Sequence, residues 1–422
     1  MRRALVALLV AASLGGALSG ARAVEDAYPV ELPPLERVRA AIADAPDVRA
    51  AMALLEAANA EERRLAVGPH EWTTRADYQR RRVNEAGAHD RFNEWGVSLE
   101  RGIRLPEKAE LDRRLGAGRV TEAEVAIADA EHEASRRLLG LWYTVLRERQ
   151  GAQLLSRQAA LAAREASAVA RRRELGDASR LEEMQAAAEA EQAEADRRVA
   201  EDLAERAAIM LVREFPAMAG FAPPAALPDP PEPAEDLAAL AREAFDGDHQ
   251  VRAAQAAAAS AQTEAQRAFA DRRPDPTVGV QYGAERSSEE RVLGVFVSIP
   301  LGGEARRASA DASFARASAL EQRAEARRRL IDAQIAAQLS AARSGVYRWK
   351  AAQRGAELQA NAAERVARAR ELGEADFAEL LRARRLALDA ALRAENVRLD
   401  ALESRARLLL DAHRLWELEA QR

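Results

Sequence analysis

The chain has 422 residues, and its 63 basic and 68 acidic residues give a formal net charge of -5. Only 4% of residues are aromatic while 31% are charged, a composition typical of long helices and one without the basic patches of a nucleic-acid-binding protein. The absence of cysteine excludes disulfides, thiol catalysis, cysteine-ligated metals and a lipidated N-terminal cysteine, so the protein is not a lipoprotein.

The N-terminus reads as an export signal. Arg2 and Arg3 precede an apolar run at residues 4–18, and the small-residue site Ala21-Arg22-Ala23 follows. This pattern predicts a signal peptide over residues 1–23 that is cleaved between Ala23 and Val24; the alternative is a core helix. No later run of 18 apolar residues occurs, so any membrane-embedded part of the mature chain is expected to be β-strand.

The rest of the chain contains an internal repeat. The segment Arg-Glu-Leu-Gly at residues 173–176 recurs at 370–373, and a glutamate follows each glycine by six positions. A weaker match relates residues 48–51 to 251–254. The sequence therefore predicts two units, residues 24–222 and 234–422, joined by a proline-rich linker at 223–233 where no helix can persist.

Each predicted unit contains a stretch with the period of two that marks β-strands. Apolar and polar residues alternate at 72–79 and 95–100, and again at 278–283 and 293–299. Polar segments at 80–94 and 285–290 separate the paired runs and are predicted to be loops. We expect two β-hairpins.

The two faces of these strands differ in chemistry. Arg75, Asp77 and Gln79 are expected on a water-facing side. The opposite face is expected to contact lipid through Trp72, Tyr78, Trp95, Val97, Val280, Tyr282, Val295 and Val297. The alternative is a small soluble sheet packed on one side. Four strands cannot close a barrel, so a membrane location requires several chains.

Helices account for most of the remaining residues. Unbroken helical patterns at 107–174 and 304–371 correspond to roughly 100 Å each. Helices at 178–214 with 235–271, and at 375–419 with 35–67, are expected to cover the return distance. Gly176 and Gly373 lie where the long helices reverse, because glycine tolerates left-handed backbone geometry there.

These residues carry a family resemblance. The repeated arginine, glycine, glutamate and alanine pattern, together with a strand ending in residues 298–303 before Arg306 and Arg307, resembles the outer-membrane efflux, or TolC-like, family over nearly the whole mature chain. The family commonly has aspartate where this chain has Glu182 and Glu379, and the first strand-to-helix junction at 104–108 lacks the glycine-rich form of the second.

The resemblance implies a mainly α fold with a small β part. Long antiparallel helices of three chains would form an α-barrel through the periplasm, and four strands per chain would contribute to a shared twelve-stranded transmembrane β-barrel in the outer membrane. It further implies that a periplasmic adaptor (membrane fusion) protein of an inner-membrane pump docks on the turns at Arg173, Leu175, Gly176, Glu182, Arg370, Leu372, Gly373 and Glu379.

The expected function is an outer-membrane channel subunit of a tripartite efflux system, without enzymatic activity or cofactor. Metal ions or drugs are the expected cargo, and the chain's length and divided second half resemble the heavy-metal efflux branch. None of the five histidines lies three to five positions from another, so no metal site is predicted. Two alternatives stay open: a type I secretion duct for proteins, and a soluble periplasmic coiled-coil adaptor or scaffold.

Overall fold

The computed structural model describes residues 28–85, 88–232 and 236–416. The predicted signal peptide, the bond between Ala23 and Val24, and residue 233 of the linker lie outside these ranges. Two compact units make up the chain. The helical unit comprises Met1–Ala45, Glu133–Gly247 and Gln334–Arg422, and the sheet unit comprises Pro46–His132 and Asp248–Ala333. Each unit draws on both halves of the sequence.

The sheet unit is built on one antiparallel sheet with strand order β1-β2-β3-β4. β1 (Trp72–Glu85) pairs with β2 (Ala88–Gly102), and β3 (Thr277–Glu285) pairs with β4 (Glu290–Ser298), so the two predicted hairpins are confirmed. β2 also pairs with β3, which joins the hairpins into a single sheet. A short 3-10 helix, η3 (Arg286–Ser288), turns the second hairpin.

The predicted loop at residues 80–94 is wrong, because most of it continues the strands. β1 and β2 stay paired from Gln79 opposite Glu94 through Arg82 opposite Arg91. Apart from Val83 and Phe92, the side chains at residues 80–94 are polar or small on both faces, so the alternation that reveals a half-buried strand disappears from the sequence. The ladder itself is made by backbone N–H and C=O groups, which are the same in every residue except proline.

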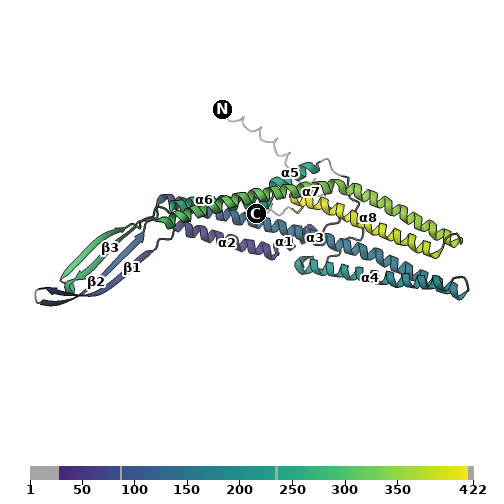
Figure 1. Ribbon diagram of the computed structural model, residues 1–422, viewed down its shortest axis with the longest axis horizontal. Coiled ribbons are helices and arrows are strands. Elements are labelled where there is room, and N and C mark those ends of the chain that lie inside the picture. Colours follow the sequence, from purple (N-terminus) through teal and green to yellow (C-terminus); the bar gives the residue numbers. More distant parts are fainter. Residues whose placement is uncertain (1–27, 86–87, 233–235, 417–422) are drawn as a thin grey trace, which may run out of the picture. The chain divides into compact units, whose positions relative to one another are not determined.

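Four helical segments complete the sheet unit: α2 (Pro46–Val67), the beginning of α3 (Pro106–Glu174), α6 (His249–Ala270) and the beginning of α7 (Glu304–Glu371). Figure 1 shows α2 leading into β1 and α6 leading into β3. Two predicted single helices are each divided in two. Pro46 separates α1 (Leu35–Ala43) from α2, and Asp248 separates α5 (Leu237–Gly247) from α6 by capping the N-terminus of α6.

The helical unit consists mainly of two helical hairpins. α4 (Arg180–Glu214) returns beside α3, and α8 (Phe377–Asp411) returns beside α7 (Figure 1). The predicted long helices at 107–174 and 304–371 are confirmed to within one residue, with 69 and 68 residues. The predicted C-terminal helix ends earlier than expected, at Asp411. α4 buries alanines at intervals of seven, the spacing with which helices pack in coiled coils, namely Ala186, Ala193, Ala200 and Ala207.

Two irregular segments pack against these hairpins inside the helical unit. The Trp142 indole N–H donates to the carbonyl oxygen of Glu31 at 2.8 Å, which fixes the N-terminal segment on α3. Burial raises the pKa of the Glu31 carboxyl group above its ordinary value. The proline-rich residues 223–232 are not helical, as predicted. None of the helices that the structure describes is both long enough and apolar enough to cross a membrane.

Candidate functional site

The register of the sheet places the predicted lipid-facing residues on one face. Residues opposite one another in antiparallel strands share a face, and one row across all four strands runs Ala76, Val97, Tyr282, Leu293. The row beside it runs Thr74, Leu99, Val280, Val295. Trp95 and Tyr282 make an edge contact, with ring centroids 5.8 Å apart. The remaining predicted members, Trp72, Tyr78 and Val297, lie in the flanking rows of the same face.

This apolar face is open in the chain. Val295 is 84% exposed and Tyr78 is 67% exposed, and every one of the eight predicted residues is at least 41% exposed. Burying such side chains would stabilise the protein by about 1.5 to 3 kcal/mol each. A single chain lacks this stabilisation, because the face stays exposed to water. A contiguous exposed patch of this kind marks a surface that contacts lipid or another protein.

The opposite face of the sheet is polar and hollowed. Arg75, Asp77 and Gln79 lie on it, as predicted, in a cavity of about 630 Å³. Gln79 donates to the Glu94 carboxylate at 2.8 Å, and Arg81 lies 3.0 Å from the same carboxylate. Phe296 is an apolar exception: its ring covers Gly279 in the position that a Cβ would occupy. An aromatic ring over a glycine shields exposed strand backbone, so Phe296 belongs to the sheet's own packing.

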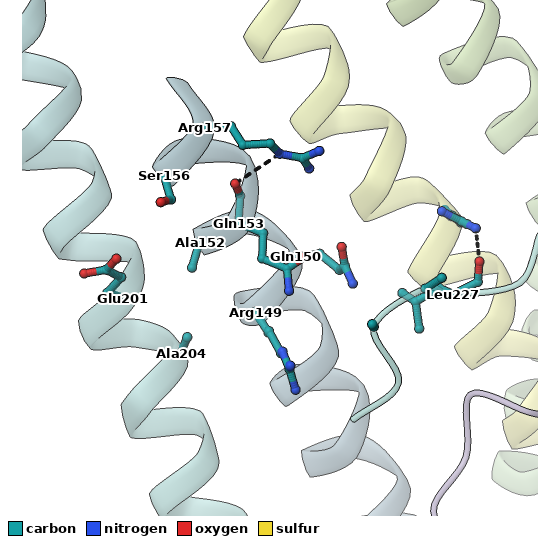
Figure 2. A pocket seen from close by; sticks show the side chains of 12 residues that line it. Arg149, Gln150, Ala152, Gln153, Ser156, Arg157, Glu201, Ala204 and Leu227 are labelled. Carbon is teal, nitrogen blue, oxygen red and sulfur yellow. Dashed lines mark hydrogen bonds between the residues drawn. The ribbon is translucent and has the colours of Figure 1, made fainter. Parts of the chain in front are cut away.

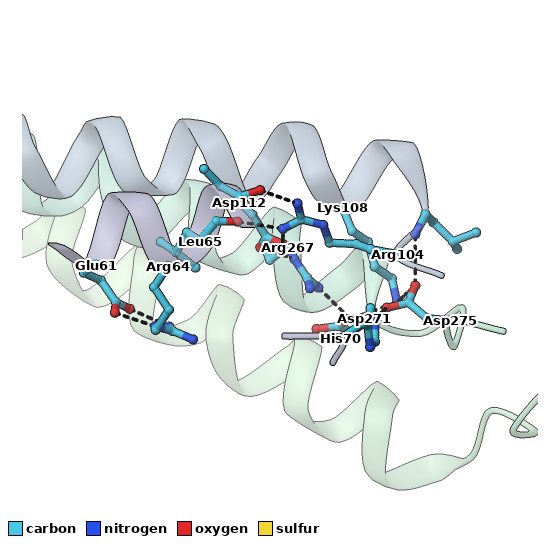
Figure 3. A network of polar contacts seen from close by, with 12 residues as sticks. Glu61, Arg64, Leu65, His70, Arg104, Lys108, Asp112, Arg267, Asp271 and Asp275 are labelled. Atoms are coloured by element: carbon cyan, nitrogen blue, oxygen red, sulfur yellow. Dashed lines mark hydrogen bonds and ion pairs between the residues drawn. The ribbon is translucent and has the colours of Figure 1, made fainter. Parts of the chain in front are cut away.

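A buried ion network fixes the sheet to its helices (Figure 3). The Lys108 ammonium group, only 2% exposed, lies 3.0 Å from carboxylate oxygens of both Asp271 and Asp275. Asp112 accepts from Arg104 at 2.9 Å and from Arg267 at 2.5 Å. Three cations and three carboxylates thus balance, and buried charges require such balance.

The network connects all the junctions between strand and helix. Arg104 donates to the carbonyls of Leu65 and Ala66 at the end of α2, and Arg306 at the start of α7 donates to the carbonyl of Asp271. Asp275 accepts from the Leu105 backbone N–H at 3.2 Å and lies 2.9 Å from His70 Nε2. The first junction, which lacks the glycine-rich form of the second, is therefore held by charged residues.

The network shifts the ionisation of its carboxylates. Burial alone would raise the pKa of Asp275, but hydrogen bonds from His70 and Lys108 outweigh burial and hold its pKa below the ordinary value. Burial opposes ionisation of Asp271 in the same way, and hydrogen bonds from Arg267 and Lys108 lower its pKa. Both groups are thus stabilised as carboxylates.

The two predicted reversals of the long helices have the same geometry. Gly176 and Gly373 have φ values of +84° and +79°. Each glycine N–H bonds the carbonyl three residues earlier, and each following N–H bonds the carbonyl five residues earlier, the pattern of a Schellman cap. Glu182 closes a capping box with Ser179 at the start of α4, whereas the Glu379 backbone N–H donates to the Asp376 side chain. The Glu182 side chain therefore has a structural role at a helix start, whereas at Glu379 the backbone N–H makes the capping contact.

An ion pair joins the two turns in the helical unit, and further contacts brace each turn from within. Arg370 bonds Glu182 at 2.5 Å and stacks over the Phe377 ring, while Arg173 bonds Glu183 at 2.5 Å. The backbone hydrogen bond from Ser179, followed by the bond from Arg370, lowers the pKa of Glu182. Leu175 and Leu372 remain 79% and 69% exposed at the turns. Each turn thus exposes a leucine side chain, while hydrogen bonds and ion pairs hold the backbone of the turn in place.

A polar groove of about 780 Å³ lies beside α3 and α4 in the helical unit (Figure 2). Its arginines bind backbone carbonyls: Arg149 donates to Pro223, Arg157 to Gln153, and Arg398 to Leu227 and Pro228. The bonds from Arg149 and Arg398 secure the proline-rich segment against α3 and α8. The groove is therefore a support for that segment.

No family model matches the chain, and no curated protein matches it in sequence. Solved structures match its fold. The outer membrane protein VceC from Vibrio cholerae aligns with a TM-score of 0.73 at 15% identity over 89% of this chain and 95% of its own. The Campylobacter jejuni CmeC outer membrane channel aligns at 0.67 and 13% identity over 90% and 85%, and a membrane protein from Pseudomonas aeruginosa at 0.75 and 17% over 92% and 94%. The chain has the fold of these proteins.

Proposed function

We propose that this chain, which shares its fold with outer-membrane channels, is the outer-membrane channel subunit of an efflux system. The observation that carries the proposal is the sheet, with exposed apolar rows on one face and a hollowed polar surface on the other. A β-sheet that separates lipid from a water-filled passage needs one apolar face and one polar face. Metal ions or drugs are the proposed cargo, and the chain itself performs no chemistry on them.

The proposal requires several copies of the chain. β1 and β4 are the two edges of the four-stranded sheet, and backbone groups at an open edge cannot remain unpaired in lipid. Three copies would supply twelve strands and remove every edge. The exposed leucines at Leu175 and Leu372 then belong to the surface on which a periplasmic adaptor of an inner-membrane pump would dock.

Two other functions use parts of the same structure. A type I secretion duct would have the same sheet and turns and differ in its cargo and pump. A soluble periplasmic scaffold would use the long helices alone, and it leaves the exposed apolar face of the sheet without a role. That face favours a channel over a scaffold.

Cell fractionation tests the proposal. The wild-type chain should appear in the outer membrane as a trimer that heat dissociates on a gel. The double variant V280R/V295R places two charges in one apolar row and should lose most of its outer-membrane fraction, since a charge facing the middle of a bilayer costs about 2–4 kcal/mol.

The matched control is S98R/Q281R, which adds the same two charges to one row of the polar face. It should fractionate like the wild type. Recovery of the wild-type chain as a soluble periplasmic monomer would contradict the channel and support the scaffold.

A further inference from the structure

Two histidines from distant parts of the sequence meet inside the sheet unit. His132 belongs to α3 and His249 is the first residue of α6. Their ring centroids are 5.6 Å apart with the ring planes at 63°, and one ring nitrogen of each lies within 4.8 Å of the other. His132 is 9% exposed and His249 is 5% exposed, so both imidazoles are buried.

Both rings are positioned by rigid elements. His249 directly follows Asp248, whose carboxylate accepts the Val251 backbone N–H at 2.9 Å and so fixes the first turn of α6. His132 lies well inside the long helix α3, and Ile127 on the same helix is also buried. Side chains that start from fixed helices and lie in packed surroundings have few alternative rotamers, so the pair is preorganised.

A pair of preorganised imidazoles is a ligand set for transition metals. Zn²⁺, Cu²⁺ and Ni²⁺ all bind imidazole nitrogen well, with bond lengths of about 2.0–2.1 Å for zinc. Two nitrogens bound to one such ion lie about 3.3 Å apart at tetrahedral angles. The nitrogens of the two rings, which lie within 4.8 Å of one another, are close to that separation.

We propose that His132 and His249 together bind a divalent transition-metal ion that ties α3 to α6. Water or further donors would complete its coordination. The ion would be a resident of the protein, distinct from any cargo, and the proposal does not depend on the channel function. Because the two ligands are far apart in sequence, a search for closely spaced histidines could not reveal them.

Equilibrium dialysis of the full-length protein, purified in detergent without a polyhistidine tag, provides the first test. Zn²⁺, Ni²⁺ and Cu²⁺ are used separately at pH 7.5. The wild type should bind one ion per chain, and H132Q and H249Q should each weaken binding about tenfold or more. H70Q is the control, because His70 Nε2 faces Asp275 at the base of the sheet, and it should bind like the wild type.

Wild-type affinity retained in both H132Q and H249Q would overturn the proposal. So would loss of binding confined to variants of His70, His89 or His413 while those two variants bind normally. Binding should also weaken in acid, because protons compete with the metal ion for imidazole nitrogen.

Electron paramagnetic resonance of Cu²⁺ bound to the wild-type protein keeps the test independent of how the variants fold. Nitrogen couplings from two imidazoles are expected. The chain has 68 acidic residues that could hold copper through oxygen, so a spectrum with oxygen ligands alone would overturn the proposal.

Discussion

Lys108 illustrates how single residues hold the sheet in place. Its ammonium group lies between Asp271 and Asp275, 3.0 Å from each, at a position that solvent barely reaches. An ammonium ion in such a place is tolerated only because carboxylates compensate it, and the carboxylates in turn depend on the cation. The junction of strands and helices is therefore sensitive to the loss of one charge.

We predict that K108M destabilises the protein by about 3–5 kcal/mol at pH 7, because it leaves two partly buried carboxylates without their shared cation. Chemical unfolding followed by the helical signal measures the effect. R113A is the control: its partner Glu110 lies on the same helix, both side chains are more than half exposed, and the change should stay within about 0.5 kcal/mol. Equal effects in the two variants would contradict the role assigned to Lys108.

The same network predicts a pH dependence. The pKa values of Asp271 and Asp275 are lowered in the folded protein, so their stabilising contribution is complete above the unfolded value of about 3.9 and is lost as the pH falls through the lower folded values. The stability difference between wild type and K108M should therefore shrink below about pH 4. The sequence shows each of these residues, but their meeting depends on the fold, because they come from segments far apart in the chain.

At the scale of elements, the turns at Gly176 and Gly373 combine a left-handed backbone, which glycine adopts without strain, with open surroundings. Both have positive φ, and no heavy atom lies within 4 Å of the position that a Cβ would take. A side chain there is opposed by backbone conformation, at about 1–2 kcal/mol, and would project from the turn. Substitution therefore alters the presented surface more than the packing beneath it.

We predict that the double variant G176W/G373W abolishes efflux while trimer formation and export stay intact, because the bulky rings would obstruct the proposed docking surface. Accumulation of candidate drugs and metal ions in cells expressing each variant provides the measurement. G355W is the control, since Gly355 is exposed in the middle of α7, also without neighbours within 4 Å, and should leave efflux unchanged. Full efflux in the double variant would show that the turns do not dock a partner.

Sequence patterns predicted which helices and strands occur better than they predicted where each one begins and ends. Alternation revealed the strands where one face is apolar and failed at residues 80–94, where pairing continues beneath polar side chains. Pro46 and the Gly247-Asp248 step are recognisable helix breaks that the expectation of long helices overlooked. The Ser179 capping box was likewise visible as serine followed three positions later by glutamate. No short sequence motif contains both His132 and His249, so the sequence alone did not indicate that they meet.

At the scale of the molecule, the unpaired edges of the sheet determine how the chain can associate with further copies. β1 and β4 each pair on one side only within the chain. In the proposed trimer, β4 of one copy lies beside β1 of the next, and since neighbouring strands of this sheet are all antiparallel, the added pair would be antiparallel as well. Edge pairing between copies buries backbone groups that would otherwise face lipid.

The lack of cysteine makes this arrangement directly testable, because every introduced thiol is unique. We predict that A76C combined in turn with L293C, V295C or V297C gives disulfide-linked dimers and trimers under oxidising conditions for at least one combination, since Ala76 and all three β4 positions share the apolar face. Denaturing gels without reductant resolve the products. A76C/V280C is the control, because β3 is a central strand, and its thiols should stay unlinked. Monomers alone in all three edge combinations would exclude a shared barrel, since cysteines about 4–5 Å apart between paired strands are within disulfide reach.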